Sequence, residues 1–327
     1  RLGPGSPGRT DGCRSQRVGP GGWAAHRRSA QDEGDVVSDA QRLQLAFSGL
    51  HPERIRDLTD RFGGPDAAVA AIARRTVKAS EAIRNNLAVP ASCREAELDT
   101  LGITVVLRGD SAYPKHLERF EDAPDLLFVR GVLPTVPGVG IVGTRRCTAY
   151  GLELAGAYGG AVAEVGWPVV SGLARGIDGA AHRGMVAVGG RGVAVLGCGI
   201  DVAYPREHRR LGEQILELGG AIVSEYPPGS RPDAWRFPPR NRIIAGLSAA
   251  VVVVEAGVTG GALITAVRAA EYGIPVFAMP GDVDRTSSEG TNRLIRDGAF
   301  PVFDPEDLIE ELSLIHYLAT TMGEGAD

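Results

Sequence analysis

Several features are scarce in this 327-residue chain, and each absence narrows its class. No apolar run approaches the roughly 18 residues that cross a bilayer, and the longest, at residues 249–255, has the length of a strand. The N-terminus lacks the apolar segment of a signal peptide, and the four scattered cysteines form no C-x-x-C pair. We therefore expect a cytoplasmic protein without membrane association, a disulfide framework or a zinc site.

Lysine is almost absent, with only Lys78 and Lys115, so 33 of the 35 basic residues are arginine. The net charge of −5 excludes a protein that is basic over its whole surface, but it leaves room for a local basic patch. Any anion site is therefore expected to use guanidinium groups, which can hold a phosphate through two parallel hydrogen bonds.

Signatures of common cofactor and metal sites are also missing. The six histidines show no metal-ligand spacing, and neither a P-loop nor a G-x-S-x-G sequence occurs. Residues 138–143 fit G-x-G-x-x-G, but the first two glycines fall before or within the apparent strand, whereas a dinucleotide site needs them after it. We predict no metal, no cofactor and no catalytic residues.

The chain divides into four parts by composition and periodicity. Residues 1–37 are rich in Gly, Pro, Ser and Arg, which predicts a disordered tail. Residues 38–98 show helical spacing interrupted by breakers, which predicts a small all-helical domain of the SAM-like or helix-hairpin kind, with a first helix near Ala40. Residues 99–303 alternate apolar strands with amphipathic helices, which predicts an α/β domain with a mostly parallel sheet and helices on both faces. Residues 304–327 are predicted as a C-terminal helical tail.

The predicted elements of the α/β part follow from these runs. The strands are expected at Ile103–Leu107, Leu126–Val129, Val139–Val142, Trp167–Ser171, Gly192–Leu196, Ala221–Ser224, Ala250–Glu255, Pro275–Met279 and Phe300–Phe303. The helices are expected at Tyr150–Glu164, Gly176–Ala187, His208–Leu218, Arg240–Leu247, Gly261–Tyr272, Thr291–Arg296 and Pro305–Leu318.

Glycine-rich loops follow four of these strands, where open α/β sheets bind their ligands. They lie at residues 143–146, 171–178, 197–199 and 257–261, and the first two also carry arginine. Glycine lets a backbone approach an anion, and a helix N-terminus points N–H groups at it. The loops predict a phosphate-recognising site; the alternative is that the glycines only form tight turns.

A second arginine cluster, at residues 236–242, places Phe237 among three arginines. Basic residues around an aromatic suit a single nucleic-acid strand, whose backbone they follow and whose bases stack on the ring. The alternative is a packed loop in which Phe237 is core and Arg240 is ion-paired.

Candidate catalytic groups are few. Asp178 and His182 stand one helical turn apart and could form an oriented base, although a surface or capping role is favoured because no nucleophile accompanies them. Glu255 ends a buried strand, where it could act as an acid or bind an arginine or a backbone N–H.

Taken together, the motifs resemble the DNA-processing protein A (DprA/Smf) family over residues 112–303. The resemblance is carried by AYPKHLERFEDAPDLLFVRG (112–131), VGTRR (142–146), SGLARGIDGAAH (171–182), VLGCGIDVAYPREH (195–208), SEYPPG (224–229), FPPRNRIIAGLS (237–248), VVEAGVTGGALITA (253–266), and MPGD with EGTNRLIRDGA (279–299).

This resemblance implies an extended Rossmann-like sheet that binds single-stranded DNA and no enzymatic activity. It further implies loading of RecA recombinase onto that DNA in natural transformation or recombination, and a homodimer. The implied DNA pocket uses the arginines of the first two glycine loops. The positions carried over as DNA-binding are Gly143, Thr144, Arg145, Arg146, Ser171, Gly172, Arg175, Gly176, Arg240, Asn241, Arg242, Thr259, Gly260 and Gly261. At Thr259 the chain departs from the family's Ser, and the hydroxyl is kept.

Two other functions remain open at this point. One is a nucleotide or nucleoside-monophosphate hydrolase on a related sheet, although Thr265 stands where such phosphoribohydrolases carry a glutamate. The other is a module that binds only protein, which would be favoured if the arginine loops fail to converge or are neutralised by Glu225 and Glu255.

Overall fold

The computed structural model describes residues 33–323. Residues 1–32 of the predicted tail and the last four residues lie outside the described part. Helix α1 (Glu33–Ala46) begins ahead of the start expected near Ala40, and it takes in the end of the predicted tail.

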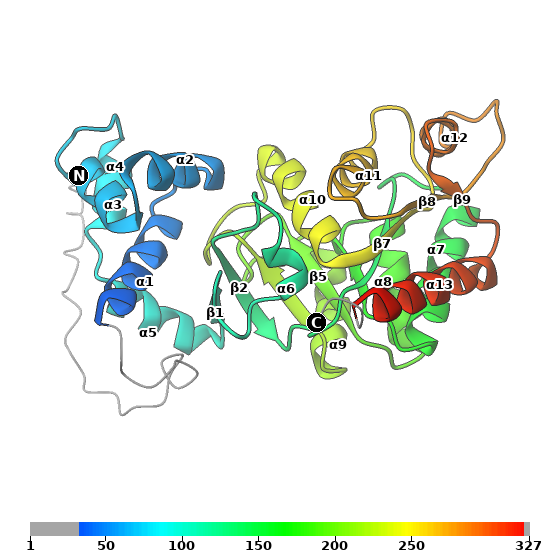
Figure 1. Cartoon of the computed structure of the whole chain (residues 1–327), viewed down its shortest axis with the longest axis horizontal. Helices are drawn as coiled ribbons and strands as arrows, with labels where there is room; N and C mark the ends of the chain where they lie inside the picture. Colours follow the sequence, from blue (N-terminus) through cyan, green and yellow to red (C-terminus); the bar gives the residue numbers. More distant parts are fainter. Residues whose placement is uncertain (1–32, 324–327) are drawn as a thin grey trace, which may run out of the picture.

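Five helices form a bundle at the N-terminal end (Figure 1). Their bounds are α1 (Glu33–Ala46), α2 (Pro52–Phe62), α3 (Pro65–Ala73), α4 (Glu81–Leu87) and α5 (Ala91–Leu101). The breakers act as caps: His51 accepts the N–H of Glu53 ahead of α2, and Gly63 ends that helix at φ 80°. Leu45, Leu58 and Ile72 centre the bundle's own core.

The bundle also packs directly on the sheet. Leu43 of α1, Phe47 in the turn that follows it and Leu98 of α5 join the core of the α/β part rather than that of the bundle. The ring of Phe47 meets that of Phe128 edge-on, with centroids 5.7 Å apart. The bundle therefore packs against the sheet in a defined position. The predicted domain boundary at residue 98 falls inside α5.

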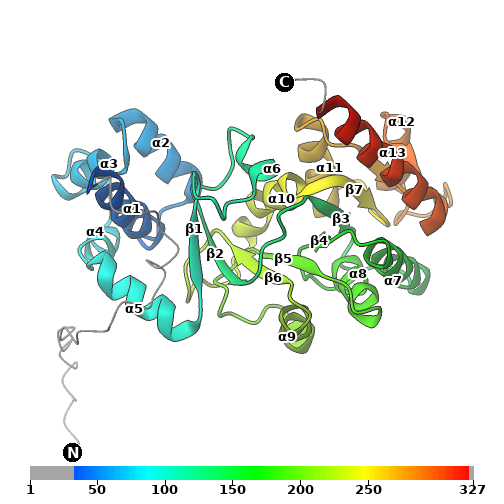
Figure 2. The same ribbon diagram turned by 60° about the horizontal axis from the view of Figure 1, so that its bottom comes forward.

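One nine-stranded sheet spans the rest of the described chain, in the order β1-β2-β6-β5-β4-β3-β7-β8-β9. Strands β1 to β7 are labelled in Figure 2, and β8 and β9 in Figure 1. The β1/β2 and β2/β6 pairs are antiparallel and the other pairs are parallel, so the predicted mostly parallel α/β class is confirmed. The strands are β1 (Thr104–Leu107), β2 (Leu126–Gly131), β3 (Gly138–Val142), β4 (Val169–Ser171), β5 (Gly192–Leu196), β6 (Ala221–Ser224), β7 (Ser248–Val253), β8 (Val276–Ala278) and β9 (Phe300–Pro301).

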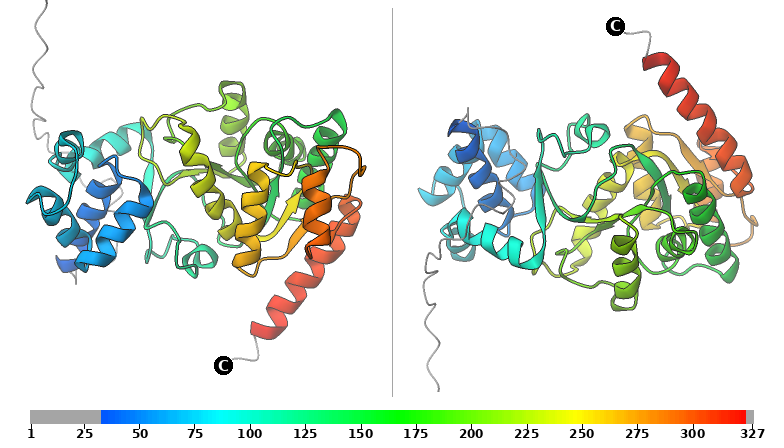
Figure 3. Two further views of the ribbon diagram at one scale, coloured as in Figure 1. Left: turned by 90° about the horizontal axis from the view of Figure 1, so that it is seen from above. Right: turned by 90° about the horizontal axis from the view of Figure 1, so that it is seen from below.

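Helices cover both faces of this sheet (Figure 3). One buried cluster joins the sheet to α7 (Ala149–Glu164), α8 (Ile177–Ala187), α9 (Arg209–Glu217) and α13 (Pro305–Gly323). The opposite cluster joins it to α6 (Lys115–Glu118), α10 (Phe237–Gly246), α11 (Gly261–Glu271) and α12 (Glu289–Arg296). Short 3₁₀ helices η2 (Arg206–His208) and η3 (Ala234–Arg236) precede α9 and α10.

The strand order reverses at β3, which lies between β4 and β7. From β3, strands β4, β5 and β6 extend to one side in sequence order, and strands β7, β8 and β9 extend to the other. Such a reversal opens a crevice at the carboxyl ends of the strands. Gly138 and Gly140 lie inside β3, as expected, and only Gly143 follows it.

Helix α10 begins earlier than expected, at Phe237 instead of Arg240. Pro238 and Pro239 lie in its first turn, where a missing N–H costs nothing because the helix has no partner for it there. The prolines that looked like breakers therefore start the helix, and this turn carries Phe237 to the carboxyl edge of the sheet.

Candidate functional site

A pocket of about 360 Å³ lies at the carboxyl ends of β3 and its neighbours. We call it the strand-end pocket. It is formed by the loop after β3, the first turns of α10 and α11, and residues beside α8 and η3. The predicted site residues that line it are Gly143, Thr144, Arg145, Arg240, Asn241, Gly260 and Gly261. The first glycine loop, the arginine-rich helix and the last glycine loop therefore do converge.

An arginine and two aromatic rings form one wall of the pocket. The guanidinium carbon of Arg145 lies 4.7 Å from the ring centroid of Phe237, a cation–π distance. The ring of Tyr204 lies 5.5 Å from that of Phe237, tilted by 37°. All three residues line the pocket, and Arg145 is exposed. This wall offers a flat apolar surface next to a positive charge.

A buried arginine and a buried carboxylate lie on another side. Arg240 is 4 % exposed and Asp178 is 6 % exposed. Burial raises the pKa of Asp178, and the nearby Arg240 guanidinium opposes that rise. Burial lowers the pKa of Arg240, and Asp178 opposes that fall. The Asp178 carboxylate also accepts the N–H of Gly172 at 3.1 Å, so it is held in place from two directions.

Gly172 is needed because a Cβ at this position would overlap the Arg240 guanidinium. Gly176, at φ 76°, starts α8 against the Thr144 carbonyl, where a Cβ would again collide. These two glycines therefore let the second glycine loop close onto the first loop and onto Arg240. They act as spacing residues and do not line the pocket.

The N-terminus of α11 faces the same pocket. Gly260 and Gly261 line it, and no side chain caps the helix there. The side-chain amide of Asn241 donates to the Gly261 carbonyl at 3.0 Å and ties α10 to this turn. Uncapped N–H groups and the helix dipole favour an anion at such a position.

The other predicted site residues lie outside the pocket. Arg146 and Thr259 are exposed on the two flanking loops. The hydroxyl of buried Ser171 donates to the Ile141 carbonyl at 2.6 Å, inside the sheet. Arg175 is 62 % exposed, and its Nη2 lies 3.1 Å from a carboxylate oxygen of Glu207. This pairing lowers the pKa of Glu207 to about 2.

Arg242 points away from the strand-end pocket, although it lies two residues from Arg240. It is 7 % exposed and pairs with Glu225 at 2.6 Å. Burial acts to lower the pKa of Arg242, but Glu225 outweighs it and raises the pKa above the usual value. Neutralisation by Glu225, one of the open alternatives, is therefore real for Arg242 but not for Arg145 or Arg240.

Glu255 takes the backbone-binding role, one of the three considered for it. Its carboxylate accepts from the Thr148 hydroxyl at 2.9 Å and the Thr148 N–H at 3.1 Å, and it does not line the pocket. It thus secures the N-terminus of α7. Within residues 33–323, no cluster of three or more His, Cys, Asp or Glu side chains could hold a metal ion, and no helix could cross a membrane.

Two pocket residues were missed as site residues. Tyr204 lies in a loop whose only sequence signal was glycine and an aromatic, which does not reveal where the ring points. A capping or surface role is the one that the sequence favours for Asp178, and it does accept a loop N–H, but it is buried beside Arg240. Only the three-dimensional structure shows this pair, because residues 178 and 240 are far apart in sequence.

Comparison with known proteins bears directly on this chain. The sequence model of a family described as "DNA recombination-mediator protein A" matches residues 104–313, more than half of the chain. Protein Smf of Escherichia coli is 44% identical over 209 residues, covering 63% of this chain and 56% of that protein. DNA processing protein DprA of Bacillus subtilis is 39% identical over 227 residues, covering 68% and 74%. The chain thus matches little more than half the length of the Escherichia coli protein.

Solved structures give the same answer. The X-ray structure of DprA from Streptococcus pneumoniae superposes with a TM-score of 0.67 at 34% identity, covering 82% of this chain and 95% of that one. DprA of Helicobacter pylori, described by its single-stranded DNA binding mode, has a TM-score of 0.57 at 28% identity, covering 64% and 95%. The family match, the sequence relatives and the shared fold agree, and the chain belongs to the DNA recombination-mediator protein A family.

Proposed function

We propose that this chain binds single-stranded DNA in the strand-end pocket and presents the bound strand to RecA recombinase. The observation that carries the proposal is the wall in which the Arg145 guanidinium lies 4.7 Å from the Phe237 ring, inside a pocket that also holds Arg240. Guanidinium groups beside aromatic rings suit the two repeating parts of a nucleotide, its phosphate and its base.

Each part of the pocket takes one part of the strand. Arg145, Arg240 and the uncapped turn at Gly260 and Gly261 hold phosphates, and Phe237 with Tyr204 supplies a platform for an unpaired base. A duplex keeps its bases stacked inside and offers only phosphates, so the single strand binds more tightly.

Exposed arginines extend this path over the neighbouring loops. Arg146 and Thr259 lie on the loops that border the pocket, and Arg175 lies on the second glycine loop, at Glu207. On binding, DNA phosphates replace the Glu207 carboxylate as partners of Arg175. Such exchanges at exposed pairs require little free energy.

Relatives support the class of ligand. The Helicobacter pylori protein is described by its binding of single-stranded DNA, and this chain shares its fold. RecA loading and homodimerisation are implied by the family resemblance. A dimer would carry two strand-end pockets, and one strand that occupies both gains effective affinity.

The chain is proposed to act without catalysing a reaction. Thr148 holds the Glu255 carboxylate away from the pocket, and Thr265 stands where the related hydrolases carry glutamate. Incubation with AMP or GMP is expected to release no free base. Turnover that Glu255→Gln abolishes would reinstate the hydrolase.

Fluorescence anisotropy of a labelled dT oligonucleotide and a matched duplex tests the binding. Arg145→Ala is expected to weaken the single-strand complex about tenfold and to lower the slope of log K against log salt by about 0.7, the value for one phosphate contact. Arg191→Ala removes the same charge from an exposed position at the amino end of β5, the opposite edge of the sheet. Equal losses in the two variants would show that the chain binds DNA through diffuse charge and not through this pocket.

RecA loading and dimerisation need their own measurements. The chain is expected to shorten the lag before RecA assembles on single-stranded DNA, and Arg145→Ala is expected to remove that effect. Light scattering is expected to give twice the chain mass of 34.3 kDa. An unchanged lag with intact DNA binding would refute the loading role alone.

A further inference from the structure

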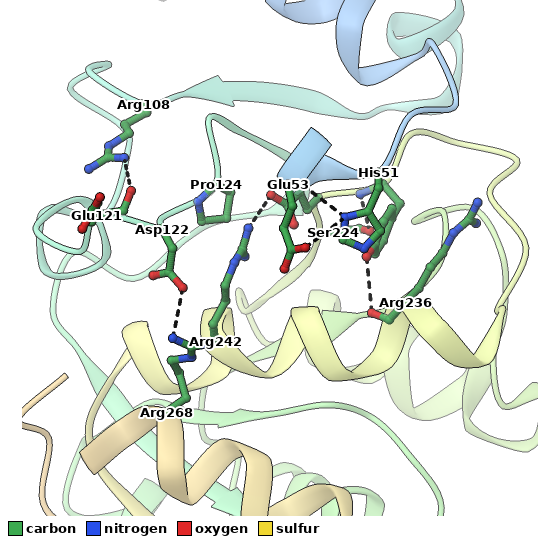
Figure 4. Close-up of polar contacts among 12 residues, drawn as sticks. His51, Glu53, Arg108, Glu121, Asp122, Pro124, Ser224, Arg236, Arg242 and Arg268 are labelled. Atoms are coloured by element: carbon green, nitrogen blue, oxygen red, sulfur yellow. Dashed lines mark hydrogen bonds and ion pairs between the residues drawn. The ribbon is translucent and has the colours of Figure 1, made fainter. Parts of the chain in front are cut away.

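A second pocket of about 360 Å³ lies between the helical bundle and the sheet. We call it the junction pocket. Helices α1 and α2 supply one side, and the SEYPPG motif after β6 and η3 supply the other. Figure 4 shows part of this region, with His51 and Glu53 of the bundle beside Ser224 and Arg236 of the α/β part. Pockets at such junctions, partly apolar with a few polar groups, are typical ligand sites.

The two pockets flank one short segment of chain. Ala234 and Phe237 line the strand-end pocket, whereas Trp235 and Arg236, between them in sequence, line the junction pocket. A strand that leaves the Phe237 ring therefore has to pass only this segment to reach the second pocket.

Aromatic surface is present in the junction pocket as well. Trp235 is 45 % exposed, and its ring lies 5.0 Å from His51 of the bundle and 6.0 Å from Tyr226. The guanidinium carbon of Arg236 lies 4.7 Å from the Trp235 centroid. A planar ligand would thus meet aromatic and guanidinium surfaces from both parts of the molecule.

Two buried polar atoms of the lining lack hydrogen-bond partners: Glu225 Oε2, an acceptor, and Arg236 Nε, a donor. The other oxygen of Glu225 is occupied by Arg242 at 2.6 Å. Buried polar atoms are normally paired, so a ligand with both donors and acceptors is indicated. Guanine has this character, because its O6 and N7 accept from arginine and its ring and amino N–H groups donate to a carboxylate.

The charge of the lining fits a neutral ring better than a run of phosphates. It contains four arginines and four acidic residues: Arg42, Arg56, Arg108, Arg236, Asp60, Glu121, Asp125 and Glu225. Arg108 donates to the carbonyls of Glu118, Phe120 and Glu121. The Arg56 side chain, by contrast, makes no hydrogen bond or ion pair within residues 33–323, so its guanidinium is available for one phosphate.

We propose that the junction pocket binds one guanine nucleotide, with its base at Trp235, Glu225 and Arg236 and its phosphate at Arg56. The nucleotide can be a unit of the strand held in the strand-end pocket, which rests on the proposed function, or a free mononucleotide, which does not. In the first case the helical bundle becomes part of the DNA-binding surface.

Titration with dGMP, followed by tryptophan fluorescence, tests the site without DNA. Quenching is expected with dGMP and about tenfold more weakly with dTMP, and Trp235→Phe is expected to remove it although Trp23 and Trp167 remain. Arg56→Ala is expected to weaken dGMP binding about tenfold. Arg54→Ala is the matched control, because Arg54 lies on the same helix, pairs with Asp57 and does not line the pocket.

Labelled dT oligonucleotides with one dG at successive positions test the strand as the source. At one position dG is expected to raise affinity about tenfold over dT. Trp235→Leu, which removes an exposed ring and leaves every buried ion pair intact, is expected to remove that preference. Quenching by dGMP without a preferred position identifies the free nucleotide as the ligand. No quenching and no preferred position, or equal responses to dGMP and dTMP, overturn the proposal. A failure of the proposed function is recognised separately, because Arg145→Ala would then leave single-strand binding unchanged. Binding of dGMP does not involve Arg145 and is unaffected by that outcome.

Discussion

The strand-end pocket and the junction pocket have similar volumes, but they differ in the balance of charged residues that line them. The strand-end pocket sets Arg145 and Arg240 against one carboxylate, Asp178, whose pKa burial raises. The junction pocket balances four arginines with four acidic residues. An excess of guanidinium groups suits phosphates, whereas balanced charge beside aromatic rings suits a base. The difference shows that the number of arginines alone does not define a nucleic-acid site; the carboxylates that face them also matter.

The same contrast separates residues that are neighbours in sequence. Arg240 and Arg242 lie two positions apart on α10, yet Arg240 lines the strand-end pocket and Arg242 is neutralised by Glu225 on the other side. Helical geometry turns residues two apart onto different faces. A cluster of arginines on a helix therefore serves two places at once.

Removing Arg240 should have the largest effect, because it would leave buried Asp178 without its positive neighbour. Arg240→Ala is expected to lower the free energy of unfolding by about 3 kcal/mol, measured in urea, and to abolish single-strand binding. The double variant Asp178→Asn/Arg240→Gln is expected to regain most of the stability and none of the binding. Recovery of binding in that variant would show that the charge of Arg240 is not used.

The pH dependence of the free energy of unfolding tests the core separately from both pockets, because His182 lines neither of them. His182 is fully buried, and burial lowers its pKa from 6.5 to about 3. The unfolded chain therefore binds a proton that the folded chain does not, so the free energy of unfolding falls as the pH drops below about 6.5. At pH 5 this amounts to about 2 kcal/mol. His182→Leu is expected to remove this part of the dependence, whereas the part due to His116, whose pKa burial lowers to about 4, remains. An unchanged slope in His182→Leu would contradict the assignment.

Phe237→Leu sharpens the distinction between stacking and charge in the strand-end pocket. Loss of the aromatic platform is expected to weaken single-strand binding about tenfold, in line with ~1–3 kcal/mol for a stacked base. The salt slope is expected to stay unchanged, in contrast to Arg145→Ala. A reduced slope would mean that Phe237 acts only by holding Arg145.

The smallest effect is expected at the exposed pair. Glu207→Gln frees Arg175 and is expected to raise single-strand affinity about threefold at low salt, consistent with the small free energy of surface ion pairs. The gain should vanish in high salt and in the double variant Arg175→Ala/Glu207→Gln. A gain that persists without Arg175 would show that Glu207 acts through general repulsion.

Much of the fold could be predicted from the sequence, because buried parallel strands have an unmistakable apolar pattern. Strands β3, β5 and β6 were expected at or within one residue of their bounds. β7 starts and ends two residues ahead of its predicted range, and Glu255, beyond its end, binds Thr148. The start of α10 was misplaced because two prolines indicate a break equally well before a helix and in its first turn.

The site could be predicted in outline but not in detail. Loops at the carboxyl ends of parallel strands must meet, so the convergence of Gly143, Arg145 and Gly260 follows from fold class. Which arginines are free does not follow, because the partners Glu207 and Glu225 are 32 and 17 residues away from theirs in sequence. The junction pocket could not be found at all, since it depends on how the bundle seats on the sheet.

Photo-crosslinking with an oligonucleotide that carries 5-iodouracil tests the central claim most directly. The halogenated base reacts with the aromatic side chain on which it stacks, and mass spectrometry of the digested complex identifies that residue. We predict crosslinks to Phe237 or Tyr204 in the strand-end pocket, lost when excess unlabelled single strand competes. Crosslinks only to aromatic residues that do not line the pocket, such as exposed Phe303, would contradict the account.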